Sequence, residues 1–326
     1  MTMTTTIPTL LVLADPCEPQ LRMLEPFRDR VHLVIGPTLE AVAGAAPSAD
    51  AILVWTASRD LLRQVFALAP RARWVHSRSA GLDTLLFPAL VDSPVPLTNS
   101  SGVYSRSLGE FVAAGVLFFA KDLHRMQRNQ AAGRWEPFDV EMAHGKTMGI
   151  VGYGDIGRAA AQLARALGMR VIALRRRPAQ SQGDPLVDEA LGTDRLLELM
   201  ARSDYVVVAA PLTPDTRGLV SADAIAAMKP SGVMINVGRG AVIDEPALID
   251  ALRHKRIRGA ALDVYAQEPL PAGHPMYGLD NLLLSPHCAD HTPTWIDDAM
   301  HFFTANLERF LQGEPLRNIV EKRLGY

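Results

Sequence analysis

Polar side chains that could handle a proton and an anion follow several short apolar runs in the second half of the sequence. Arg239 stands in NVGRGAVID, Asp263 in ALDVY, Glu268 in AQEPL and His287 in SPHCAD. A histidine titrates near neutral pH, and a neighbouring carboxylate orients the imidazole and stabilises its charged form. An arginine binds a carboxylate through two parallel hydrogen bonds. Each residue alone has an ordinary structural explanation, but together they are what hydride transfer to a 2-keto acid requires.

A second informative stretch is the glycine-rich segment VGYGDIGRAA, which begins at Val151. Its glycines stand at 152, 154 and 157, after the apolar run MGIVG and before a stretch with helical apolar spacing. In this context the first glycine allows a tight turn, the second lets a pyrophosphate approach, and the third allows close helix packing. The N–H groups and positive dipole end of the helix favour the anion. We therefore expect a dinucleotide at Gly152, Gly154, Asp155, Ile156 and Gly157.

The choice of dinucleotide depends on the residue that ends the next apolar run. About 20 residues after the glycines, an acidic side chain ordinarily binds the ribose hydroxyls of NAD. This sequence has Arg175 there, followed by Arg176 and Arg177. Guanidinium groups bind phosphate through paired hydrogen bonds, so the sequence favours NADP(H) over NAD(H). The alternative is a solvated basic loop, which leaves NAD(H) as the cofactor.

The composition limits the classes of partner. The chain has 326 residues, of which 48% are hydrophobic and 21% charged, and a formal net charge of -2. That balance gives no general attraction to nucleic acid or to an anionic membrane surface, so small molecules are the expected partners. The longest strongly apolar run, FVAAGVLFFA (111–120), is about half the ~20 residues that a membrane-spanning helix needs.

The cysteines and the N-terminal segment bear on the compartment. Cys17 and Cys288 are far apart and lack zinc-ligand spacing, which favours a reducing compartment without a disulfide or a structural metal. The first residues, MTMTTTIPTLLVLADP, have no basic segment before their short apolar run, so they predict a first strand rather than a secretory signal. We expect a cytoplasmic protein.

Short apolar runs recur along the chain, with stretches of helical spacing between them. The first series is TLLVLA (9–14), VHLVIG (31–36), AILVWT (51–56), RWVHS (73–77) and VPLTNS (95–100). The second is KTMGIVG (146–152), RVIALRRR (170–177), DYVVVAAPLT (204–213), GVMINVGRG (232–240), GAALDVY (259–265) and NLLLSPH (281–287). This alternation predicts two doubly wound α/β domains with buried parallel strands. Because such sheets bind ligands beyond the carboxyl ends of their strands, the residues after each run are the candidates for a site.

Two helices predict how the domains connect. Ser107 and Glu110 fit a capping box at the start of a largely buried helix that leaves the first domain. Near the C-terminus an apolar stripe, with Gly313 as the expected stop, predicts a helix that packs on the first domain. The stripe consists of Ile296, Met300, Phe303, Leu307 and Phe310. The predicted boundaries are residues 1–100 plus 291–326 for a substrate domain and residues 101–290 for a dinucleotide-binding domain.

Several ordered blocks are similar to D-isomer-specific 2-hydroxyacid dehydrogenases, and within that family to glyoxylate and hydroxypyruvate reductases. The blocks are KTMGIVGYGDIGR, APLTPDTRGLVSADAIAAMKPSGVMINVGRGAVIDEPALIDAL, IRGAALDVYAQEPLP and NLLLSPH, with the shorter SAGLD (79–83). The resemblance implies a Rossmann cofactor domain inserted into a flavodoxin-like substrate domain. It also implies NAD(P)-dependent hydride transfer between a small 2-keto acid and a D-2-hydroxy acid, in a homodimer.

The resemblance assigns roles by motif. His287 resembles the general acid/base, Glu268 its partner, and Arg239 the clamp on the substrate carboxylate and carbonyl. Asp263 resembles the residue that holds the nicotinamide carboxamide, and the backbone N–H groups of SAGLD would bind the substrate carboxylate, with an ordinary turn as the alternative. The further implied cofactor contacts are Pro211, Val237, Arg175 and Arg176, and the further substrate contacts are Ser79, Ala80 and Gly81.

Some positions depart from the family pattern or leave alternatives. The segment LHRMQRNQAAGRWEPFD is interpreted as part of an intersubunit arm, with a packed core position as the alternative for Trp135. Asp290, His291 and Trp295 follow the histidine where small residues are commoner, and we expect them to shape substrate choice. Cys288 is expected to be a buried, unreactive thiol rather than an oxidation-sensitive one.

Two other functions stay open on the sequence alone. Phosphite dehydrogenases resemble the same scaffold and share the arginine, glutamate and histidine, whereas formate dehydrogenases are disfavoured because they carry a glutamine near the histidine. A dinucleotide-sensing protein similar to the C-terminal-binding corepressors keeps this fold, but the sequence contains no disordered tail or peptide-docking segment that would support it.

Overall fold

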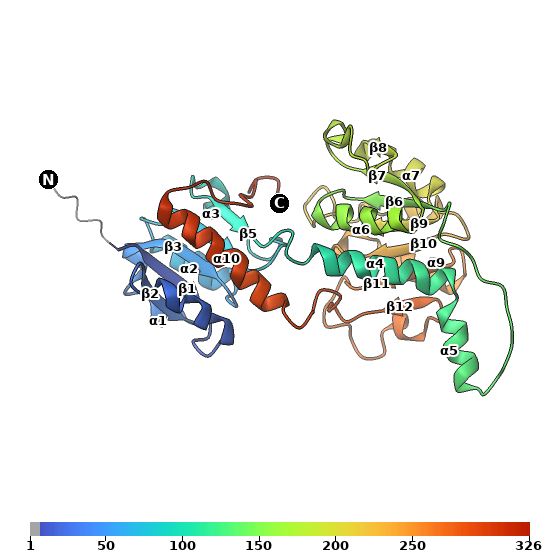
Figure 1. Cartoon of the computed structure of the whole chain (residues 1–326), viewed down its shortest axis with the longest axis horizontal. Coiled ribbons are helices and arrows are strands. Elements are labelled where there is room, and N and C mark those ends of the chain that lie inside the picture. The colour runs from blue at the N-terminus through green and yellow to red at the C-terminus, as the bar shows by residue number, and fades with distance from the viewer. Residues whose placement is uncertain (1–6) are drawn as a thin grey trace. The chain divides into compact units, whose positions relative to one another are not determined.

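The chain forms two compact units, each with its own parallel sheet. The structure, a computed structural model, describes residues 7–326; residues 1–6, the start of the segment considered above as a leader, lie outside them. The discontinuous unit takes in the described residues up to Val103 together with Pro293–Tyr326, and the inserted unit is Tyr104–Thr292 (Figure 1). No helix among the described residues is long and apolar enough to cross a membrane.

The discontinuous unit is built on five parallel strands. They are β1 (Thr9–Leu13), β2 (His32–Gly36), β3 (Ala49–Val54), β4 (Trp74–Ser77) and β5 (Leu97–Asn99). Their order across the sheet is β2-β1-β3-β4-β5, with every pair parallel. This is the flavodoxin-like order of doubly wound folds, and the central strands are buried along their whole length because helices cover both faces.

The helices of this unit come from both ends of the chain. They are η1 (Pro19–Phe27), α1 (Leu39–Val42), η2 (Ala46–Ser48), α2 (Arg59–Ala67), α3 (Pro88–Asp92) and α10 (Trp295–Gln312). The predicted apolar stripe of α10 packs inward, where Phe303 stacks on Trp74 of β4 with ring centroids 5.3 Å apart. The helix ends as expected at Gly313, whose φ of 68° suits a residue without a side chain.

The inserted unit has a seven-stranded parallel sheet. Its strands are β6 (Thr147–Val151), β7 (Arg170–Leu174), β8 (Glu189–Leu191), β9 (Tyr205–Val208), β10 (Val233–Asn236), β11 (Gly259–Leu262) and β12 (Leu282–Leu284). The order β12-β11-β10-β9-β6-β7-β8 is the Rossmann order with one further strand. β8 is not among the predicted strands, because this three-residue edge strand has only one fully buried residue and therefore no apolar run.

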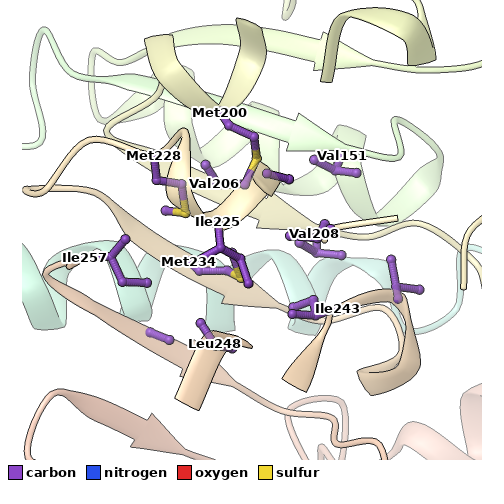
Figure 2. Close-up of a cluster of buried hydrophobic side chains, with 14 of the residues drawn as sticks. Val151, Met200, Val206, Val208, Ile225, Met228, Met234, Ile243, Leu248 and Ile257 are labelled. Atoms are coloured by element: carbon purple, nitrogen blue, oxygen red, sulfur yellow. The ribbon is translucent and has the colours of Figure 1, made fainter. Parts of the chain in front are cut away.

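Helices cover both faces of this second sheet. They are α4 (Ser105–Ala120), α5 (Leu123–Ala131), α6 (Asp155–Ala166), α7 (Leu196–Arg202), α8 (Ala222–Ala226) and α9 (Glu245–Arg253), with short turns η3 (Pro178–Ser181), η4 (Thr193–Arg195), η5 (Gly240–Val242) and η6 (Pro275–Gly278). Figure 2 shows the core on the α7, α8 and α9 side, where Met200, Ile225 and Leu248 meet residues of β9 and β10. Such burial of apolar side chains is the main source of stability and fixes the strand ends.

The start of α4 differs from the prediction. The helix begins at Ser105 with Tyr104 as its N-cap and no capping side chain, so the expected capping box of Ser107 and Glu110 is wrong. Ser107 instead lies within the first turn and donates a hydrogen bond to the carbonyl oxygen of Ala289, at 2.6 Å. The Ser107 hydroxyl therefore bonds a residue that is distant in sequence rather than capping its own helix.

Candidate active site and cofactor site

His287 and Glu268 meet directly beyond the carboxyl ends of β11 and β12. The imidazole Nδ1 lies 2.6 Å from Glu268 Oε2, a distance typical of a strong, charge-assisted hydrogen bond. The other oxygen, Oε1, accepts from the backbone N–H of Tyr265 at 2.9 Å, which fixes the carboxylate plane. Both side chains are partly exposed, with relative areas of 43% for His287 and 34% for Glu268, so the pair is accessible from solvent.

The loop that carries His287 is held in an uncommon conformation. His287 has a φ of 53°, in the left-handed region that side chains other than glycine rarely adopt. Asp263, 1% exposed at the end of β11, secures this turn: its Oδ1 accepts from the backbone N–H groups of Cys288 and Ala289 at 3.0 and 3.1 Å. The same oxygen accepts from the hydroxyl of Ser285 at 2.6 Å. A buried carboxylate thus keeps the imidazole in place.

Arg239 follows β10, the next strand in the sheet, and its turn is equally well held. The buried side chain of Asn236 accepts from the N–H of Gly238 at 3.0 Å and donates to the carbonyl oxygen of Arg239 at 3.1 Å. A Cβ on Gly240 would stand 1.9 Å from the carbonyl carbon of Tyr265, so only glycine lets this turn pass the backbone that leads to Glu268. Arg239, Glu268, Asp263 and His287 therefore share one sheet edge.

The glycine-rich loop has the shape of a phosphate cradle. Gly152 has a φ of 95°, and a Cβ there would lie 2.5 Å from the backbone nitrogen of Ala210. A Cβ on Gly157 would lie 2.7 Å from the carbonyl oxygen of Gly152, whereas one on Gly154 would meet no atom within 4 Å. The loop is thus tight on its inner side and open at Gly154, above the N-terminus of α6. This geometry fits a pyrophosphate on the first-turn N–H groups, which have no acceptor within the helix.

The remaining predicted cofactor positions lie on neighbouring strand ends. Pro211 follows β9, where its carbonyl oxygen accepts from the hydroxyl of Thr216 at 2.6 Å, and Val237 follows β10 and is 3% exposed. The loops meet at Ala210, because Cβ atoms on Gly152 and Gly238 would both strike its backbone. These contacts bring the predicted positions of three strands together at one edge.

Arg175 and Arg176, which follow β7, contact different kinds of partner. Arg175 donates to Ser181 Oγ at 3.1 Å and to Gln180 Oε1 at 2.6 Å, both neutral acceptors. Arg176 pairs with Asp215 at 3.3 Å, and that carboxylate is 80% exposed. Neither contact is a buried ion pair, so both guanidinium groups can exchange these partners for a phosphate at small cost.

The predicted substrate loop lies in the discontinuous unit, directly after β4 and Arg78. The N–H of Ser79 donates to Ser77 Oγ at 3.2 Å, and Asn99 Nδ2 donates to the carbonyl oxygen of Ala80 at 2.7 Å. Among the described residues no hydrogen bond uses the N–H groups of Ala80 and Gly81. The loop therefore has a fixed backbone and offers two N–H groups, those of Ala80 and Gly81, to an anion. The third N–H group, that of Ser79, already donates within the chain.

Asp290, Cys288 and Trp135, for which the sequence left expectations, differ in burial. Burial raises the pKa of the Asp290 carboxyl, which lies 3.8 Å from His291. Cys288 is exposed, so the expectation of a buried thiol is wrong; the turn that points the backbone N–H of residue 288 at Asp263 leaves its side chain outside. Trp135 is 98% exposed, so a packed core position for it is wrong as well.

Several residues that hold the site are not indicated by the sequence motifs. Asn236, Tyr265 and Ser285 belong to apolar runs, yet each hydrogen-bonds a loop that carries a candidate site residue. A polar residue at the end of a buried strand, as in VMIN before VGRG, is the signal that could have found Asn236. No group of three metal-ligating side chains lies together in the part of the chain that the structure describes.

Comparison with known proteins bears on the same residues. Residues 113–289 match the family described as D-isomer specific 2-hydroxyacid dehydrogenase, NAD binding domain. A glyoxylate reductase from Aeropyrum pernix is 33% identical over 304 residues, which are 88% of each chain. A D-3-phosphoglycerate dehydrogenase from Methanocaldococcus jannaschii is 29% identical over 317 residues, and the match covers 95% of this chain but only 59% of that relative.

A solved structure gives the same result for the fold. The D-isomer specific 2-hydroxyacid dehydrogenase from Xanthobacter autotrophicus Py2, in complex with NADPH and MES, is 32% identical with a TM-score of 0.84. The match covers 98% of this chain and 100% of that one. The two sheets and the glycine loop define an oxidoreductase that uses a nicotinamide dinucleotide. The chain belongs to the D-isomer-specific 2-hydroxyacid dehydrogenase family, which confirms the resemblance and the predicted fold class.

Proposed function

We propose that this protein is an NADP(H)-preferring reductase of small 2-keto acids such as glyoxylate, hydroxypyruvate or an aryl pyruvate. The observation that carries this proposal is the 2.6 Å contact between His287 Nδ1 and Glu268 on the sheet edge that also holds Arg239. A proton donor, a carboxylate that orients it and a cation for the substrate carboxylate are the groups that keto acid reduction needs.

In this mechanism His287 moves the proton. Because Glu268 occupies Nδ1, Nε2 is the ring atom that donates to the carbonyl oxygen of a keto acid, and Glu268 stabilises the imidazolium before the transfer. In the reverse direction neutral His287 accepts the hydroxyl proton at the same atom. A bound nicotinamide would supply or take up the hydride at C2 of the substrate.

Other residues bind and orient the substrate. The guanidinium of Arg239 binds the substrate carboxylate and polarises the carbonyl, with its backbone fixed by Asn236. The N–H groups of Ala80 and Gly81 add two donors to the substrate carboxylate, whereas the N–H of Ser79 already donates to Ser77 Oγ. Asp263 holds the His287 loop, and its Oδ2 is the atom that would accept from a nicotinamide carboxamide, because Oδ1 already accepts three hydrogen bonds.

Cofactor preference follows from Arg175 and Arg176. Both guanidinium groups lie just past the end of β7, where NAD-specific sites carry an acid; Arg175 donates to two neutral acceptors, and the Asp215 carboxylate that pairs with Arg176 is exposed. The neighbour from Xanthobacter autotrophicus was solved with NADPH, which supports the same preference. NADH remains an alternative cofactor of lower efficiency in this proposal.

The experiment measures loss of nicotinamide absorbance with NADPH and with NADH against glyoxylate, hydroxypyruvate, pyruvate and phenylpyruvate. Arg175→Asp should shift the ratio of kcat/KM from NADPH toward NADH by about 10- to 100-fold, the value of one or two lost charge-assisted hydrogen bonds. Arg170→Asp is the matched control, because Arg170 begins the same strand at its opposite end and is exposed. Absence of turnover on every keto acid with both cofactors would overturn the proposal.

We also propose a cytoplasmic homodimer that associates through α5 and the segment after it. Large apolar side chains are exposed there: Leu123 38%, Met126 43%, Trp135 98%, Val140 46% and Met142 66%. Exposed patches of this kind mark interaction surfaces. Light scattering should give twice the chain mass, and Trp135→Ser with Met142→Ser should lower it; a monomeric wild type would contradict this part.

A further inference from the structure

The discontinuous unit carries large side chains beyond β3 and β4 to which the proposed function gives no role. Trp55 directly follows β3, and Arg78 directly follows β4 and precedes the Ser79–Gly81 loop. The two strands are neighbours with Val54 opposite Ser77, and the backbone N–H of Arg78 donates to the carbonyl oxygen of Val54 at 3.1 Å. Both side chains therefore start from adjacent points on the sheet edge where ligands of doubly wound folds bind.

The guanidinium of Arg78 lies against two indole rings. Its central carbon is 5.2 Å from the ring centroid of Trp55 and 5.9 Å from that of Trp295, the first residue of α10. A guanidinium contacts aromatic rings through its faces and donates hydrogen bonds in its own plane. The two rings therefore restrict the orientation of the guanidinium group, whose N–H donors are directed within its plane. The result is a positioned positive charge immediately before a loop with anion-binding N–H groups.

Trp55 adds an independent observation. The residue is 2% exposed, and among the described residues its buried Nε1 has no hydrogen-bond partner. The indole of Trp74 in the same sheet is satisfied, because its Nε1 donates to Thr98 Oγ1 at 2.8 Å. Buried N–H donors are almost always paired, so an unpaired one in contact with a positioned arginine indicates an acceptor on a ligand. Charge and donor together match the oxygens of an anionic group.

We propose that Arg78 and Trp55 bind a second anionic group of the substrate, so that the preferred 2-keto acids carry a carboxylate, sulfonate or phosphate at the end distant from C1. This inference rests on the proposed function, because it takes the Ser79–Gly81 loop as the site of the substrate's first carboxylate. Arg78 is adjacent in sequence to that loop, so the two anionic groups belong to a short molecule, such as a 2-keto dicarboxylate of four or five carbons. Recognition of the second anion then occurs wholly within the discontinuous unit.

The test compares substrates of matched length with the wild-type full chain and NADPH. The pairs are oxaloacetate against 2-oxovalerate and 2-oxoglutarate against 2-oxohexanoate. We expect kcat/KM to be at least about 10-fold higher for the dianion of one pair, and Arg78→Met to lower that ratio by about 10- to 100-fold, as loss of a charge-assisted contact does. Arg71→Met is the matched control, because Arg71 is exposed at the opposite end of β4 and removes the same charge.

Trp55→Phe keeps an aromatic ring but removes the N–H donor together with part of the indole. We expect a KM for the dianion raised about 3- to 10-fold with kcat retained, from the loss of one hydrogen bond, and a melting temperature lowered by a few degrees because the smaller ring leaves a cavity at this buried position. If Arg78→Met fails to fold cooperatively, this variant and the wild-type ratios decide the question. A purely structural role would change kcat and KM for both members of a pair alike.

The outcomes separate the two proposals. Reduction of glyoxylate or hydroxypyruvate with a dianion ratio below one, or an equal loss on both members of each pair in Arg78→Met, would overturn the subsite and leave the proposed function intact. No reduction of any 2-keto acid would overturn both. A preference for a sulfonate or phosphate analogue of the same length over the dicarboxylate would support the subsite and identify its anion.

Discussion

The two histidines at His287 and His76 show how one side chain serves opposite purposes in the two units. His287 is 43% exposed and shares its Nδ1 with a carboxylate. His76, in the middle of β4, is 0% exposed, and its Nδ1 contacts the hydroxyl of Thr98 at 2.7 Å among the rings of Trp74, Phe302 and Phe303. In the proposed function the first carries a proton to the substrate, whereas the second is a polar member of a core.

The difference lies in the surroundings of the two imidazole rings. Glu268 places a carboxylate oxygen 2.6 Å from His287 Nδ1 at the surface. Among the described residues no carboxylate forms an ion pair with His76, and burial lowers the pKa of the imidazole to about 3, so it stays neutral at every physiological pH. The Thr98 hydroxyl accepts from Trp74 and has its own hydrogen left to donate to His76. A histidine is therefore identified as functional by its partner and its exposure rather than by its presence.

The largest expected effect is on turnover. His287→Gln should lower kcat by about 10²- to 10⁴-fold, the usual contribution of general acid–base catalysis, without changing the Kd of NADPH. Stopped-flow reduction of glyoxylate and a fluorescence titration with NADPH measure the two quantities. A variant with more than a tenth of wild-type kcat would remove His287 from the mechanism and with it the contrast between the two histidines.

Removing the partner charge should cost less. Glu268→Gln keeps the shape and the hydrogen bond to Tyr265 but loses the negative charge beside Nδ1, so kcat should fall by about 10- to 100-fold, as for a charge-assisted hydrogen bond. Glu245→Gln is the matched control, since Glu245 accepts from the N–H of Ala266 without contacting His287. Equal losses in the two variants would show that the effect is structural.

The contrast also predicts how stability depends on pH. The folded-state pKa of His76 is about 3, below the ordinary value of 6.5, so the unfolded chain binds the proton first and stability falls as pH drops below 6.5. Between pH 7 and 5 this contributes a loss of about 2 kcal/mol in the free energy of unfolding. Urea unfolding of the wild type, His76→Gln and the exposed control His32→Gln measures it. An unchanged slope in His76→Gln would show that other groups control acid unfolding.

The smallest expected effect tests the support of the His287 loop. Ser107→Ala removes the hydrogen bond to the carbonyl oxygen of Ala289, which is worth about 0.5–1.5 kcal/mol. We expect kcat to fall no more than about tenfold and the melting temperature to drop by a few degrees. A loss as large as that of Glu268→Gln would mean that the loop is held mainly by α4 rather than by Asp263.

The local pattern of this sequence determined most of the sheet architecture and the identity of the chemical groups. Short apolar runs indicated buried parallel strands, and the glycines at 152, 154 and 157 indicated the turn into α6, so eleven of the twelve strands among the described residues were predicted and β8 was not. The motif blocks likewise indicated His287, Glu268 and Arg239 by residue type and order along the chain.

Only the tertiary structure decided what holds those groups and which similar residues are inert. The hydrogen bonds of Asp263 to residues 285–289, the anchoring of Arg239 by Asn236 and the attachment of Ser107 to Ala289 join positions on different elements. The burial of His76 and the exposure of Cys288 and Trp135 likewise depend on how helices pack over the sheets. A sequence pattern reports neighbours along the chain, whereas the charge state and reactivity of a side chain depend on its neighbours in space.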